Sequence, residues 1–137
     1  PSLSDVTRLG VGHRHACALR ADGRVACWGR NYAGMVGDGS TTDVHEPVVL
    51  DDLADVIVIQ AGAAHSCALR ADGTVMCWGR NEAGQLGDGT FTDHHRPHLV
   101  PSLSGVVDLT LSMAATRPTE ALSVLVARVL QIVPDRR

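Results

Sequence analysis

The sequence predicts an all-β fold built from two copies of one unit of about four short strands. The stretch from His15 to Asn31 returns almost letter for letter from His65 to Asn81, fifty positions later. Within each copy, an Ala-Asp-Gly turn joins two apolar stretches, which is the pattern of a β-hairpin. A repeat of about 50 residues is typical of propeller blades or of solenoid arrays.

The repeat divides the chain into four parts. Residues 101–109 echo residues 1–9, but the pattern stops after Thr110. We therefore expect a first repeat, a second repeat, the start of a third and a non-repeat tail, at residues 1–54, 55–104, 105–110 and 111–137.

Each repeat begins with a strand and ends with one. Asp55–Gly62 is a β-branched run that ends at Gly, as expected for a buried strand, and Val6–Leu9 is its weaker counterpart. Short outer strands are expected at Pro47–Leu50 and Pro97–Val100, with Pro at the first position, where a strand tolerates it. Between them, the glycine-dense segment Gly29–Gly39 predicts a structured loop.

The central hairpin has a predicted register. A three-residue loop with Gly23 in the left-handed conformation sets Leu19 opposite Val25 and Cys17 opposite Cys27. Gly73 takes the same part in the second repeat. A two-residue loop would instead pair Cys17 with Trp28, but the recurrence of both cysteines favours the first register.

The tail has a different periodicity. Its apolar residues fall at three- and four-residue spacing, which predicts a helix over residues 119–133, with Pro118 near its start and Pro134 after its end.

Composition excludes several classes of protein. At 137 residues with 45% hydrophobic residues the chain fits one ordinary domain, and Trp28 and Trp78 are the large pieces of its core. The net charge is −3, and the cations are all Arg and scattered along the sequence, so we expect no nucleic-acid partner. The longest apolar stretch, Ala121–Val133, is too short to cross a bilayer, so we expect no membrane span. No signal peptide is visible.

The four cysteines allow three interpretations: cross-strand disulfides Cys17–Cys27 and Cys67–Cys77, buried thiols, or zinc half-sites. Zinc ligands favour cysteines two to four residues apart, whereas a full hairpin separates these. We expect the disulfides, with buried thiols as the alternative. Disulfides in turn favour an extracellular, periplasmic or cell-surface location.

The histidines suggest no metal site. His15 and His65 occupy equivalent positions, so a structural, hydrogen-bonding role is expected for both. The cluster His94-His95-x-x-His98 has no carboxylate or Cys at ligand spacing. We expect no metal, no cofactor and no catalytic residues, and therefore no enzyme.

Positions that differ between the repeats are the better candidates for a contact surface. Tyr32, Phe91 and Arg96 are the binding candidates; the other repeat has Glu82, Thr41 and Glu46 at the matching positions. Exposed aromatic residues anchor many interfaces. Neutral drift between the repeats is the alternative.

The repeat resembles the regulator-of-chromosome-condensation repeat family. The second repeat matches that family's pattern almost completely from Gly62 to Gly89, including Trp78, whereas the first departs at Met35 and Val36. The similarity covers about residues 5–109 and excludes the tail. It implies a partial β-propeller of two four-stranded blades plus the first strand of a third. The helical tail that follows is expected from the spacing of its apolar residues alone. The cysteine-containing form resembles bacterial exported members.

The resemblance implies binding rather than catalysis. We expect a non-catalytic protein-binding or scaffold module, a fragment of a larger propeller, whose partner is another protein. The alternative is a regulator or inhibitor of another protein, either guanine-nucleotide exchange-like or an enzyme inhibitor. Two blades do not close a ring. Three arrangements are compatible with this: the chain is part of a longer protein, it assembles with copies of itself to complete a ring, or its tail helix covers an open flank.

Overall fold

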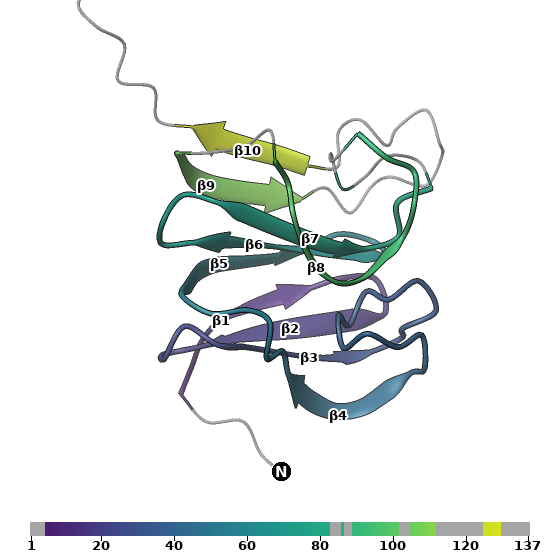
Figure 1. The fold of residues 1–137 in the computed structure, drawn as a ribbon. Coiled ribbons are helices and arrows are strands. Elements are labelled where there is room, and N and C mark those ends of the chain that lie inside the picture. Colours follow the sequence, from purple (N-terminus) through teal and green to yellow (C-terminus); the bar gives the residue numbers. More distant parts are fainter. Residues whose placement is uncertain (1–4, 83–85, 87–88, 102–104, 112–124, 130–137) are drawn as a thin grey trace, which may run out of the picture.

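The computed structural model describes residues 5–82, 86, 89–101, 105–111 and 125–129, and within them every regular element is a strand (Figure 1). The strands are β1 (Val6–Val11), β2 (His15–Arg20), β3 (Val25–Gly29), β4 (Val44–Val49), β5 (Val56–Ala61), β6 (His65–Arg70), β7 (Val75–Gly79), β8 (His94–Leu99), β9 (Val106–Leu111) and β10 (Leu125–Val129).

The strands form three antiparallel sheets. Blade 1 contains β1 to β4 in chain order, blade 2 contains β5 to β8 in the same order, and β9 pairs with β10. Figure 1 shows the sheets stacked one above another, with blade 1 next to blade 2 and the β9–β10 sheet beyond it. The predicted all-β fold of two four-stranded blades is confirmed.

The hairpin register is confirmed. Leu19 lies opposite Val25 and Cys17 opposite Cys27, and blade 2 repeats this pairing. Gly23 has a φ of 82°, in the left-handed region that other residues avoid, so the three-residue loop closes without strain. The Arg20 amide donates to the carbonyl of Arg24 at 2.9 Å, which closes the turn.

The outer strands begin earlier than predicted. β4 begins at Val44 and β8 at His94, three residues before Pro47 and Pro97. Both prolines therefore lie inside a strand, but each strand is the outer edge of its blade. An edge strand needs amide donors on one side alone, so a proline is tolerated there.

The tail differs from the predicted helix where it is described. Residues 119–124 and 130–133 lie outside the described residues, whereas Leu125–Val129 form β10, with Leu125 opposite Leu111 and Val129 opposite Val106. Its partner β9 offers an unpaired strand edge to this segment, and a short apolar run with β-branched residues is compatible with either a strand or a helix.

The main core lies between the two blades. Blade 1 contributes the Cys17–Cys27 pair and neighbouring aliphatic side chains. Blade 2 contributes the face of its sheet that packs against blade 1. The buried members are Cys17, Leu19, Val25, Cys27, Val36, Leu50, Leu53, Val56, Ile59, Ala68 and Trp78. A second cluster joins blade 2 to β9 through Val106 and Leu109.

Candidate functional site

The contact between the blades centres on one main-chain carbonyl. The carbonyl oxygen of Met35 accepts hydrogen bonds from the Trp78 indole Nε1 at 2.9 Å and from the Ser66 hydroxyl at 3.0 Å. The Ser66 oxygen also lies 2.8 Å from Nε2 of His15. These bonds join a loop and a strand of blade 1 to β6 and β7 of blade 2, so they hold the two blades together at one interface.

His15 and His65 lie inside the blades. A Cβ on Gly12 would be 2.3 Å from the His15 ring, and one on Gly62 would be 2.2 Å from the His65 ring, so each ring packs directly on glycine backbone. Burial lowers the pKa of both histidines to about 4, and the neighbouring His15 contributes to the lowering at His65. Both side chains are therefore neutral near pH 7.

The cysteines lie in the same interior. The sulfur atoms of Cys17 and Cys27 are 2.06 Å apart and those of Cys67 and Cys77 are 2.05 Å apart, and all four side chains are buried. Among the described residues, no group of three His, Cys, Asp or Glu side chains is placed to hold a metal ion. In the same part of the chain, no helix is long and apolar enough to cross a membrane.

The glycine-dense loop of each blade is organised around a buried asparagine, a role that the sequence analysis missed. The Asn31 amide nitrogen donates to the carbonyls of Ser40 and Thr42 at 3.0 and 2.9 Å, and its oxygen accepts from the amide of Val36 at 2.9 Å. Asn81 occupies the same place in blade 2. The presence of this Asn at the same position of both repeats is the sequence feature that indicates its structural role.

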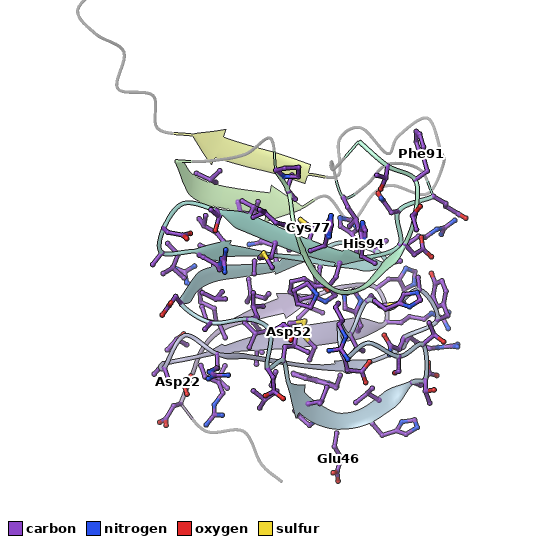
Figure 2. The ribbon with its side chains drawn as sticks, in the orientation of Figure 1. Asp22, Glu46, Asp52, Cys77, Phe91 and His94 are labelled. Atoms are coloured by element: carbon purple, nitrogen blue, oxygen red, sulfur yellow. A yellow bond between two sulfur atoms is a disulfide. The ribbon has the colours of Figure 1, made fainter. Side chains whose placement is uncertain are left out.

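The three predicted binding residues do not share one site. Phe91 lies on the loop before β8 and is 72% exposed (Figure 2). Arg96 lies on β8 and forms an exposed ion pair with Asp52, with 3.1 Å between Nη1 and Oδ2. Tyr32 is exposed on the loop after β3 and lines a hollow between the blades.

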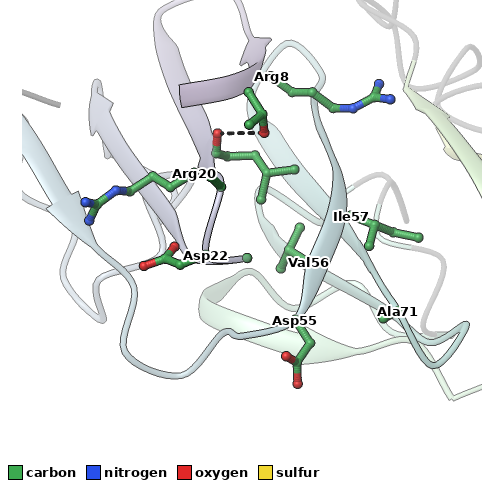
Figure 3. Close-up of a pocket in the computed structure, with 11 residues that line it drawn as sticks. Arg8, Arg20, Asp22, Asp55, Val56, Ile57 and Ala71 are labelled. Atoms are coloured by element: carbon green, nitrogen blue, oxygen red, sulfur yellow. Dashed lines mark hydrogen bonds between the residues drawn. The ribbon is translucent and has the colours of Figure 1, made fainter. Parts of the chain in front are cut away.

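A groove of about 470 Å³ lies at the turn end of the blades, between the blade 1 hairpin turn and the start of β5 (Figure 3). Its charged residues include Arg20 and Asp55, of opposite sign, and Figure 3 shows the Arg8 and Arg20 side chains extending in different directions. This mixture of charges favours no particular ligand.

A second hollow, of about 400 Å³, lies at the opposite, loop end of the blades, and we name it the arginine hollow. It is lined by His13, Arg14, Arg30, Tyr32, Met35, Ala63, Ala64 and Arg80. The arginines are scattered along the sequence, but the fold brings three of them here. The sequence feature that points to this hollow is the difference between the repeats, since the second repeat has Ala63 and Ala64 at the positions of His13 and Arg14.

The outer face of blade 1 is apolar and open. Leu9 is 60% exposed, whereas its counterpart in blade 2, Ile59, is 1% exposed because blade 1 covers it. Val11 is exposed and Trp28 half-buried on the same face, although Trp78, at the equivalent place, is fully buried. The face of blade 1 that corresponds to the blade 2 side of the interface is therefore exposed to solvent.

The family comparison agrees with this architecture. Two models described as the regulator of chromosome condensation (RCC1) repeat match the chain, one over residues 6–34 and 56–85 and the other over residues 22–69 and 72–115. The second match covers more than half of the chain and reaches from blade 1 to beyond β9.

Solved structures show the same fold. Prp20p from Saccharomyces cerevisiae, studied with its binding properties to Gsp1p and histones, matches with a TM-score of 0.67 and 24% identity over 72% of this chain and 27% of its own. The structure of Kap60 bound to yeast RCC1 (Prp20) gives 0.74 and 20% identity, over 82% of this chain and 29% of that one. Human WBSCR16 gives 0.68 and 25% identity, over 78% and 29%. The chain therefore spans under a third of each of these structures.

Proposed function

Because the chain belongs to the regulator of chromosome condensation (RCC1) repeat family, we propose that it is a non-catalytic module that binds other proteins and is a fragment of a larger propeller. The similar structures support this, since Prp20p is described with Gsp1p and histones and yeast RCC1 (Prp20) with Kap60, all of which are proteins.

The non-catalytic part of the proposal is supported by the state of the reactive side chains. All four cysteines are held in disulfides, so none is a thiolate nucleophile. His15 and His65 are buried and neutral within the scaffold, where no substrate reaches them.

The open face of blade 1 carries the protein-binding part of the proposal. Leu9, Val11 and Trp28 form an apolar surface whose counterpart in blade 2 is covered by another blade. Exposed apolar surface of this kind marks a protein-interaction site. The occupant that fits is a further blade, which offers an apolar face and a main-chain carbonyl to the Trp28 indole, as blade 1 does for Trp78. Such a blade belongs to a longer chain, because within this chain the inner faces of both blades are already covered, by blade 2 and by β9. In the isolated chain, the open face of a second copy takes its place.

Sedimentation velocity tests this proposal. The purified chain should self-associate as its concentration rises, and Leu9→Asp should return it to the monomer because the charge opposes burial of that face. Phe91→Asp is the matched control, since Phe91 is exposed on a loop away from the face, and it should associate like the wild type. A well-folded monomer at every concentration would contradict self-association, as would equal effects of the two variants.

We also propose that the protein resides in an oxidising compartment outside the cytoplasm. The support is the pair of buried cross-strand disulfides, which persist in such environments. Thiol titration of the denatured, unreduced protein from its native source should find no free thiol, and four free thiols would refute the proposed location.

A further inference from the structure

The arginine hollow brings together positive charges from three separate segments. Arg14 comes from the loop between β1 and β2, Arg30 follows β3, and Arg80 follows β7 of the other blade. All three residues line one hollow of about 400 Å³ at the loop end of the blades. A hollow lined by several guanidinium groups favours an anionic ligand, because each group offers a planar set of N–H donors that matches a carboxylate.

The charge of the hollow is only partly neutralised from within. Arg80 forms an ion pair with Glu82. The guanidinium groups of Arg14 and Arg30 make no ion pair with the residues that the structure describes. The hollow is therefore positive in a chain whose net charge is −3. A local charge opposite in sign to that of the whole chain attracts a negatively charged partner at short range.

The main chain beneath these arginines is fixed. The Arg30 amide donates to the carbonyl of Arg14 at 2.9 Å, and Gly29, with a φ of 115°, permits the approach because a Cβ there would lie 2.6 Å from that oxygen. The His13 amide donates across the blade boundary to the carbonyl of Ala63 at 3.3 Å. The cationic side chains therefore extend from a framework that holds both blades together.

Apart from His13, the rest of the lining is apolar and aromatic. Ala63 and Ala64 stand where the first repeat has His13 and Arg14, so their small side chains leave the space open. Tyr32 is 57% exposed at the hollow and presents a ring with a polar end. Such a lining suits a ligand that carries an apolar side chain beside its negative charges.

We propose that the arginine hollow binds an acidic segment of a partner protein, with its carboxylates on Arg14 and Arg30 and an apolar side chain against Tyr32. This inference rests on the proposed function, because it takes the ligand to be part of another protein. A nucleic acid fits less well, because its backbone calls for cations along a stripe, and the chain is acidic as a whole.

Fluorescence anisotropy tests the proposal with a fluorescein-labelled peptide of alternating Glu and Leu. The full chain should bind this peptide more tightly than the same peptide with Gln in place of Glu. Arg14→Gln and Arg30→Gln should each weaken binding by about tenfold, as expected for loss of one charge-assisted contact. Arg8→Gln, which removes the same charge at the turn end, is the matched control and should bind like the wild type.

Three results would overturn the proposal. The first is equal binding of the Glu and Gln peptides, or no binding of either. The second is a loss with Arg8→Gln as large as that with Arg14→Gln. The third is a single-stranded DNA oligonucleotide that binds more tightly than the Glu peptide and depends on Arg14 and Arg30, which would make the hollow a nucleic-acid site. Because the open face is tested separately by sedimentation, failed peptide binding with intact self-association would refute this inference alone.

Discussion

Acidification should destabilise the fold through its two buried histidines. The pKa of His15 and of His65 is about 4 in the folded protein, against 6.5 for an ordinary histidine. Below pH 6.5 the unfolded chain therefore binds more protons than the folded chain, so stability rises with pH. The stabilising contribution is fully present above pH 6.5 and is lost as the pH falls from 6.5 towards 4.

The size of the effect follows from the pKa difference. Between about pH 7.5 and about pH 5, each histidine should reduce the free energy of unfolding by about 2 kcal/mol, so the pair should reduce it by about 4 kcal/mol. The pKa values of Asp38 and Asp72 lie below their ordinary 3.8, so these carboxylates stay ionised across this window and do not contribute to the change.

Urea denaturation followed by tryptophan fluorescence at the two pH values measures this loss. His15→Gln should lose about 2 kcal/mol less on acidification than the wild type, whatever its stability at neutral pH. His45→Gln, which removes an exposed histidine of β4, is the control and should lose as much as the wild type. The reasoning is refuted if acidification leaves the wild type unchanged, or if His15→Gln and His45→Gln lose the same amount.

Two further predictions concern stability at neutral pH. Replacing Cys17 and Cys27 together by Ala should lower the free energy of unfolding by about 2–3 kcal/mol, because the short loop they close is released in the unfolded chain; no shift in the urea midpoint would argue against a disulfide there. Trp78→Phe should cost about 2 kcal/mol through a void and a lost hydrogen bond to the Met35 carbonyl, whereas Trp28→Phe should cost less than about 1 kcal/mol. If the two variants lost the same free energy of unfolding, the argument from the greater burial of Trp78 would be contradicted.

The hairpins could be predicted because their determinants are local. The left-handed Gly23 and the recurrence of Cys17 and Cys27 leave one register that satisfies both, and the structure has it. The tail is the opposite case. Its apolar spacing fits a helix, but Leu125–Val129 pair with the edge of β9, a non-local partner that residue spacing does not reveal.

The candidate sites were harder to predict for the same reason. Arg14, Arg30 and Arg80 are far apart in the sequence, so they look scattered until the blades stack. Tyr32 and Phe91 both differ from their counterparts in the other repeat, yet Tyr32 lines the arginine hollow and Phe91 lies elsewhere. A difference between repeats shows that the scaffold does not require a particular side chain at that position, and it does not show which site the residue belongs to.

The carbonyl of Met35 has a consequence for how such chains lengthen. Every amino acid has a main-chain carbonyl, so the residue at this position can mutate while the acceptor for Trp78 and Ser66 remains. The second repeat already has Gln85 at the matching position. A duplicated gene segment thus encodes its own tryptophan. The blade encoded by the preceding copy provides the main-chain carbonyl that accepts its hydrogen bond, whichever side chain that blade has at this position. Addition of a blade by gene duplication therefore requires no compensating mutation at position 35.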